Sequence, residues 1–317
     1  MSKRHLENRS LEDKILEHRS LEYLTLENLA YRMLGSVADA QDVVQEASLK
    51  VFKLDKQPRN LQAYLFRVVT NLALDRLRHE KASRAHYHGP WLPEPLPTDR
   101  IVELADSLSL GFLMMLERLS PAERVVFVLR NGFDLSFSEI AEVLEIEVAA
   151  CRQRYRRAKQ NISREKRFVT PLAEQKKLLD KLILAVAEED LHALVSLFSD
   201  DAVAYTDGGG IVSAAIRPIT GPQRIAQVML HLARRAEIEG AISYREVALN
   251  GGVGLLIRQN GELHSCVQLD GEEGYITRLY VMRNPEKLAG MVTLSGKQPD
   301  TDSRSASRAY VPIAVVT

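Results

Sequence analysis

Apolar side chains recur at helical spacing through most of the first third of the chain. From Leu24 to Leu34, and again from Ala40 to Leu54, they return every three to four positions, as on the buried stripe of an amphipathic helix. The same pattern predicts a third helix from Leu61 to His79. Its expected inward positions are Leu65, Val68, Val69, Leu72 and Leu77. Residues 21–88 are therefore predicted to form a helical bundle.

Glycine, polar residues and prolines mark the ends of these helices. Gly35-Ser36 is expected to end the first helix, and Asp39 is placed to cap the second. Residues 89–99 contain four prolines, which cannot lie inside a helix because proline lacks an N–H donor and clashes with the preceding turn. We therefore expect residues 89–108 to form a stiff, extended linker.

A second helical region is predicted from 109 to 168. Ser120-Pro121-Ala122-Glu123 combines an N-cap, a proline at the first helical position and a capping-box glutamate, and it begins a helix that runs to about Arg130. Ser136 and Glu139 form a second capping box, which begins a short helix from Phe137 to Leu144. Another helix follows from Val148 to Ser163. Two short helices joined by a tight turn are typical of a helix-turn-helix.

The pattern changes from helical to alternating in residues 169–290. Two helical segments, 172–187 and 190–198, precede short runs with the period of two that strands show. These runs are 202–205, 211–216, 244–249, 253–258, 263–269 and 275–281. Asn250-Gly251-Gly252, Asn260-Gly261 and Asp270-Gly271 are the expected turns. We predict an α+β domain with a curved antiparallel sheet, and a disordered tail over 291–317.

Charge is segregated along the chain although its total is zero. Forty-two Lys and Arg balance forty-two Asp and Glu. Between Glu147 and Arg167, however, eight basic residues face two acidic ones, as expected where one module contacts nucleic acid. Arg152, Gln153, Arg156 and Arg157 lie on the outward face of the Val148 helix and suit base or phosphate contacts. The alternative is a basic helix that only faces solvent.

Other features exclude whole classes of protein. No apolar run is long enough for a membrane span, and residues 1–20 form a polar N-terminal extension without the apolar core of a signal peptide, so we expect a cytoplasmic protein. Cys151 and Cys266 are far apart in sequence, and they build neither a disulfide framework nor a metal site. No cofactor or metal is expected.

Several segments, in order, resemble regions 2 and 4 of the extracytoplasmic function (ECF) sigma factors. They are Ala40 to Glu46, Ala63 to Arg78, and Leu119 to Arg124 with Glu139-Ile140-Ala141. Further motifs resemble the ECF subgroup that carries a fused C-terminal SnoaL-like domain. These are Trp91-Leu92-Pro93-Glu94-Pro95, Asp207-Gly208-Gly209-Gly210 and Asn284-Pro285-Glu286-Lys287-Leu288. That subgroup usually has Lys and Asp where this chain has Ile211 and Glu286.

The resemblance implies a transcription initiation factor that binds core RNA polymerase and promoter DNA. Region 2 would contact the clamp helices of the β′ subunit through Asp42, Val43, Gln45 and Glu46, and region 4 would contact the β flap. Asn71 would read the opened minus-10 strand, with phosphates held by Arg67, Arg76 and Arg78. The Val148 helix would read the minus-35 duplex. Trp91 is interpreted as a packing anchor, with base stacking as the alternative.

The resemblance further implies that the C-terminal domain regulates the sigma regions itself, without a separate anti-sigma factor. Whether this domain binds a small ligand stays open at this point. One alternative is a one-component helix-turn-helix regulator with a small-molecule domain, which would need neither the Asp42 to Glu46 edge nor Asn71. Another is a SnoaL-like enzyme, for which an acid-base pair among Asp207, His231 and His264 would be required.

Overall fold

The computed structural model describes residues 23–54, 58–84, 86–100, 109–162 and 170–291. The described chain divides into two units. The first contains the described residues up to Lys81, 99–100 and 115–162, and the second contains 82–98, 109–114 and 170–291. The N-terminal extension and, apart from Met291, the predicted tail lie outside the described residues.

Three helices of the first unit follow the predicted order. They are the helical residues 23–34, α2 (Val37–Phe52) and α3 (Leu61–Arg84). The cap of α2 is Ser36 and not Asp39, because the Ser36 hydroxyl accepts the Asp39 N–H. Helix α3 continues past His79, and its most buried apolar positions are Val69, Ala73, Leu74 and Leu77. The expected inward residues Leu65, Val68 and Leu72 are only half-buried.

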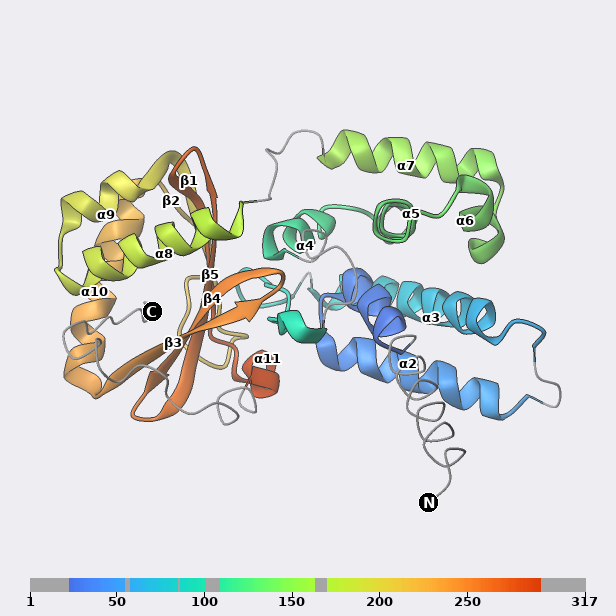
Figure 1. The fold of residues 1–317 in the computed structure, drawn as a ribbon, viewed down its shortest axis with the longest axis horizontal. Helices are drawn as coiled ribbons and strands as arrows, with labels where there is room; N and C mark the ends of the chain where they lie inside the picture. Colours follow the sequence, from blue (N-terminus) through green and yellow to red (C-terminus); the bar gives the residue numbers. More distant parts are fainter. Residues whose placement is uncertain (1–22, 55–57, 85, 101–108, 163–169, 292–317) are drawn as a thin grey trace, which may run out of the picture. The chain divides into compact units, whose positions relative to one another are not determined.

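The helix-turn-helix is present as predicted. The helices of this region are α4 (Leu110–Leu116), α5 (Pro121–Gly132), α6 (Phe137–Leu144) and α7 (Val148–Ile162), and the last two form the motif (Figure 1). Both capping boxes form, with reciprocal hydrogen bonds between Ser120 and Glu123 and between Ser136 and Glu139. Glu145 ends α6 in the left-handed conformation, at φ 52° and ψ 48°. A non-glycine residue tolerates this conformation at a cost, so the tight turn does not require glycine.

The second unit is an α+β domain. In chain order its elements are α8 (Leu172–Ala187), α9 (Leu191–Leu197), β1 (Phe198–Asp207), β2 (Ile219–Thr220), α10 (Pro222–Glu239), β3 (Ile242–Leu249), β4 (Gly252–Gln259), β5 (Glu262–Glu272), β6 (Tyr275–Met282), α11 (Pro285–Leu288) and the 3-10 turn η3 (Ala289–Met291). Its strands form one curved sheet in the order β2-β1-β6-β5-β4-β3 (Figure 1).

Four details of this domain differ from the sequence prediction. The sheet is mixed, since β1 and β6 pair in parallel. Residues 211–216 form a loop and not a strand, whereas helix α10 was not predicted. Asp270-Gly271 is an irregularity within β5, and the chain turns instead at Glu273 and Gly274, which both have positive φ. The hairpin turns at Asn250-Gly251 and Asn260-Gly261 form as expected.

Both faces of the sheet are covered. Helices α8, α9 and α10 pack on one face and build the main apolar core with residues such as Leu182, Met229 and Val267 (Figure 1). The second apolar cluster contains Tyr280 and Met282 of β6, and also Leu92 from the predicted linker. A linker residue is therefore part of the core of the second unit. Within the described ranges, no helix has the length and apolar character needed to cross a membrane.

Candidate functional site

Asp207, at the end of β1, is completely buried and is the centre of a polar network. We call residues 86–98, of which Tyr87 and Leu92 bind Asp207, the strap. One carboxylate oxygen of Asp207 accepts hydrogen bonds from the Tyr87 hydroxyl (2.6 Å) and the Gly209 N–H (2.9 Å). The other accepts from the Leu92 N–H (2.9 Å) and from Lys287 Nζ (2.7 Å). The carboxylate thus joins three segments that are far apart in sequence.

Lys287, on α11, is the cation of this network. Its Nζ also donates to the Leu92 carbonyl oxygen at 2.6 Å, so Leu92 has both of its backbone polar groups paired. The same Nζ lies 4.2 Å from the centre of the Trp91 ring, and the Arg84 guanidinium lies 3.6 Å from that ring. Burial lowers the pKa of Lys287, an effect that the charge of Asp207 opposes.

The glycine motif is shaped for close backbone approach. Because β1 and β6 are parallel, Asp207 pairs with Met282, and its carbonyl accepts the N–H groups of Arg283 (2.7 Å) and Asn284 (2.9 Å). Gly209 has a φ of +67°, and a Cβ there would lie 2.4 Å from the Asn284 side-chain nitrogen. The Asn284 amide in turn donates to the Tyr87 hydroxyl at 3.1 Å. Only glycine fits this contact.

The strap has a second anchor that the sequence did not indicate. The Leu96 N–H donates to the Asn250 side-chain oxygen (3.1 Å), and the Asn250 N–H donates to the Leu96 carbonyl (2.7 Å). Thr98 accepts the Gly251 N–H at 3.3 Å. Asn250-Gly251 is recognisable in the sequence only as a hairpin turn. Tyr87 and Leu96 carry no sequence signal, because their partners are more than a hundred residues away.

The predicted duplex-reading residues form one exposed surface of the first unit. Arg152, Gln153, Arg156 and Arg157 of α7 are all exposed, whereas Cys151 and Ala158 on the opposite face are buried. The three arginines among them have no ion pair or hydrogen bond to another described residue. Unpaired guanidinium groups on one helix face can bind phosphates or base edges.

The basic residues predicted for region 2, unlike those of α7, are paired with carboxylates. Arg76 pairs with Asp39, Asp42 (3.5 Å) and Glu80 (3.6 Å), and Arg78 pairs with Asp75 at 2.8 Å. Asp42, Gln45 and Glu46 are exposed on α2, but Val43 is 1% exposed. The side chain of Val43 packs inside the helical bundle, so its contact with polymerase stays a prediction that the exposed neighbours fit better.

Within the first unit, the N-terminal helices pack directly against the helix-turn-helix region. The buried Arg32 donates to the Gly132 carbonyl (3.1 Å), and Arg124 donates twice to the Arg32 carbonyl (3.1 Å each). The rings of Phe66 and Phe133 meet edge to face at 5.5 Å. Arg67, a predicted minus-10 contact, lies 3.7 Å from Glu145 in the turn between α6 and α7. Half-buried Asn71 lies one helical turn beyond Arg67 on α3.

The three candidates for acid-base catalysis have different neighbours. Asp207 belongs to the strap network, and His231 is exposed on α10. His264 lies 2.7 Å from the Arg283 guanidinium, and burial together with this cation lowers its pKa to about 4. An acid-base pair among these three residues is not assembled in the described part of the chain.

A buried acid that the sequence prediction missed, Asp270, lies within β5. Asp270 accepts a hydrogen bond from the Tyr280 hydroxyl at 2.7 Å, and burial raises its pKa from 3.8 to about 6. Because the folded-state pKa is raised, this group's contribution to stability is complete below the ordinary pKa. It is lost as pH rises through about 6.

We expect Asp270→Asn to remove part of the pH dependence of stability. The free energy of unfolding of the native domain should fall by about 2–3 kcal/mol as pH rises from about 4 to about 6 and then level off, and the amide variant should lack this fall. Urea unfolding at a series of pH values across this window measures it. Asp180→Asn, an exposed change on α8, is the control. Equal pH slopes in the native protein and in Asp270→Asn would contradict the assignment.

Comparisons with known proteins match the helical regions of the chain to one family. The family model "Sigma-70 region 2" matches residues 22–83, and "Sigma-70, region 4" matches residues 109–162. The ECF RNA polymerase sigma factor SigJ of Mycobacterium tuberculosis is 32% identical over 289 residues, which cover 83% of this chain and 89% of that protein. This chain belongs to the ECF sigma factors.

Two further comparisons agree with this membership. The probable ECF sigma factor SigI of Mycobacterium tuberculosis is 29% identical over 278 residues, covering 82% of this chain and 90% of that protein. The crystal structure of SigJ matches with a TM-score of 0.71 at 29% identity, over 87% of this chain and 98% of that one. The similarity therefore includes the SnoaL-like C-terminal domain.

As an ECF sigma factor, the protein binds core RNA polymerase and directs transcription initiation at promoters. This accounts for the region 2 helices, which a one-component regulator would not need. Residues 170–291 of the second unit, by contrast, lie outside both sigma-70 family matches.

Proposed function

We propose that the SnoaL-like domain inhibits this sigma factor by holding the linker between regions 2 and 4. The buried network of Asp207, Lys287 and Leu92 carries the proposal. In this proposal, residues 21–88 and 109–168 are the two sigma regions, residues 89–108 are the linker, and residues 169–290 are the regulatory domain. The domain acts by contact and not by catalysis, in the cytoplasm and in place of a separate anti-sigma factor.

The hydrogen bonds of the strap support a held linker. An extended proline-rich segment has no internal hydrogen bonds, so its backbone groups normally bind water. Here Leu92 and Leu96 each have both backbone groups paired to the second unit. Leu92, Pro93, Pro95 and Leu96 are also buried. Such a linker cannot extend until these contacts break.

The contacts inside the first unit support inhibition rather than activation. Arg67 and Phe66 of α3, on the side proposed to hold the minus-10 strand, are in contact with Glu145 and Phe133. Promoter binding through Arg67 and Asn71 then requires region 4 to leave this position. A linker that is held by the second unit restricts that movement.

The proposal assigns separate partners to the exposed residues. Asp42, Gln45 and Glu46 bind the β′ clamp helices, where acidic and amide groups suit a basic partner, and region 4 binds the β flap. Arg152, Gln153, Arg156 and Arg157 read the minus-35 duplex. Asn71 reads the opened minus-10 strand, with phosphates held by Arg67, Arg76 and Arg78 after their carboxylate partners are exchanged.

A pair of glycine variants tests the inhibitory contact in the full-length protein. Gly209→Ala places a Cβ against Asn284, at 2.4 Å, and should loosen the strap. Gly274→Ala has a similar positive φ of +83° but meets no atom within 4 Å, so it controls for backbone strain. In run-off transcription with core polymerase on a panel of promoters, we expect higher output from Gly209→Ala only.

Equal output from the native protein and both variants would contradict regulation through the strap. Lower output from Gly209→Ala at unchanged core binding would contradict its inhibitory sign. Gel filtration with core polymerase separates these outcomes from a simple failure to fold or to bind.

A further inference from the structure

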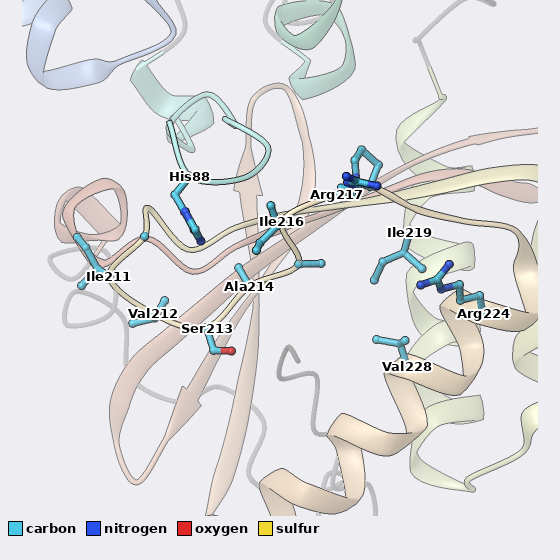
Figure 2. A pocket seen from close by; sticks show the side chains of 13 residues that line it. His88, Ile211, Val212, Ser213, Ala214, Ile216, Arg217, Ile219, Arg224 and Val228 are labelled. Atoms are coloured by element: carbon cyan, nitrogen blue, oxygen red, sulfur yellow. The ribbon is translucent and has the colours of Figure 1, made fainter. Parts of the chain in front are cut away.

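The second unit has a surface cavity of about 830 Å³ beside the glycine motif (Figure 2). This volume lies in the range of small-molecule sites. The cavity is lined by the loop between β1 and β2, the first turns of α10 and one strap residue. These residues are His88, Gly210, Ile211, Val212, Ser213, Ala214, Ala215, Ile216, Arg217, Pro218, Ile219, Arg224 and Val228.

Hydrogen bonds outside the cavity hold its loop in place. The Thr206 hydroxyl accepts the Ala215 N–H (2.8 Å) and donates to the Ala215 carbonyl (3.3 Å). The Arg283 guanidinium donates to the Ser213 carbonyl. Gly89 of the strap packs on the same loop, since a Cβ there would lie 3.4 Å from the Ala215 oxygen. Contacts within the domain itself therefore fix the shape of the loop that lines the cavity.

The charge of the lining has one sign. Arg217 and Arg224 line the cavity together with His88, and the lining contains no carboxylate. Neither arginine pairs with another described residue. On the same helix as Arg224, by contrast, Arg234 pairs with Glu189 and Arg235 with Glu239. The cavity thus holds two guanidinium groups whose donors are available to an anion.

The remaining lining is largely apolar and open to water. Ile211 is 55% exposed and Ile216 is 62% exposed, which places them among the most exposed large apolar residues of the described chain. In Figure 2, Arg217 and Arg224 lie on the side of Ile219, whereas Ile211 lies at the opposite end with Ile216 between them. A charged end and an apolar end are thus separated along one cavity.

We propose that this cavity binds an amphipathic organic acid. Its carboxylate is held by Arg217 and Arg224, and its hydrocarbon body covers Ile216 and Ile211. A purely apolar ligand would leave the two guanidinium groups without partners, and a small inorganic anion would leave the isoleucines in water. Only a molecule with both parts matches the lining.

Decanoate, below the concentration at which it forms micelles, is a suitable probe for calorimetry with the full-length protein. We expect saturable binding. The double change Arg217→Gln with Arg224→Gln should weaken it at least about tenfold, or about 1.4 kcal/mol. The matched control is Arg234→Gln with Arg235→Gln, which removes the same charge outside the cavity and should leave affinity unchanged. Ile216→Ser should also weaken binding.

Several results would overturn the proposal. They are the absence of saturable decanoate binding, an affinity for decanol or for inorganic phosphate equal to that for decanoate, and a control pair that weakens binding as much as the Arg217 and Arg224 pair. Decanol tests the need for a negative charge, and phosphate tests the need for a hydrocarbon body. Far-ultraviolet circular dichroism of each variant confirms that the domain is folded.

A ligand in this cavity would contact His88 and Gly210, whose neighbours belong to the strap network. Regulation of the strap by this ligand rests on the proposed function. Decanoate should slow amide hydrogen exchange at Leu92 and Leu96. An unchanged exchange rate would contradict the link to the strap. Calorimetry tests the binding site without transcription, so failure of the site and failure of the proposed regulation can be distinguished.

Discussion

Replacement of Asp207 by alanine is expected to destabilise the SnoaL-like domain by about 3–5 kcal/mol. The change removes a completely buried carboxylate and leaves the Lys287 ammonium with the Leu92 carbonyl as its remaining hydrogen-bond partner in the network. The Tyr87 hydroxyl and the Leu92 N–H lose their acceptor as well. Urea unfolding, followed by hydrogen exchange of the β5 and β6 amides, measures the loss in this domain separately.

Two further variants sharpen this experiment. Glu189→Ala breaks an exposed ion pair with Arg234 in the same domain and should leave the unfolding midpoint nearly unchanged, since exposed pairs contribute little. Asp207→Asn combined with Lys287→Met removes both buried charges and should recover part of the loss. If Asp207→Ala lowered the free energy of unfolding no more than Glu189→Ala does, the buried pair of Asp207 and Lys287 would not be what holds the strap.

Arg156→Ala and Asn71→Ala are expected to fail at different steps of initiation. Arg156 is exposed on α7, and loss of a good base contact costs about 1–3 kcal/mol. The polymerase complex of Arg156→Ala should therefore bind duplex promoters roughly ten- to hundredfold more weakly and lose its minus-35 preference. Asn71→Ala should bind the duplex normally but open it poorly. Binding to duplex and to pre-melted templates measures the two steps.

The pre-melted template decides between the two roles. This template needs no opening but still presents the minus-10 strand. Asn71→Ala should therefore bind it more weakly, because the base contact is lost. The defect of Arg156→Ala should be confined to the duplex minus-35 element. Arg235→Ala, a change in the other unit, controls for the loss of one positive charge. If both variants were equally defective on the pre-melted template, the division of roles would be wrong.

Local sequence signals predicted those parts of the fold whose causes are local. The capping boxes at Ser120 and Ser136 formed because their partners are three residues away. Helix α10 lacks only a side-chain cap at Gly221, and its first-turn proline and its apolar residues at helical spacing are local signals that the prediction overlooked. Residues 211–216 have the apolar content of a strand, but the Ala215 N–H binds the Thr206 hydroxyl and Gly89 of the strap packs against the Ala215 carbonyl.

The candidate site was predictable only in part, for the same reason. The resemblance indicated Asp207, Lys287 and the proline-rich segment, but not how they meet. Their meeting depends on the parallel register of β1 with β6, which no local pattern in the sequence encodes. Tyr87 and Asn250 joined the site through contacts with residues at least a hundred positions away. Val43 is a different case, since the apolar spacing of residues 40–54 already predicts a buried stripe that contains it, whereas the resemblance alone made it a polymerase contact.

The position of Trp91 gives the protein an internal optical probe. It is the one tryptophan of the chain, and its ring lies 3.6 Å from the Arg84 guanidinium and 4.2 Å from the Lys287 ammonium. Departure of the strap would separate the indole from the Lys287 cation and expose it to water. The emission spectrum of the unlabelled sigma factor therefore reports, in real time, whether the linker is docked.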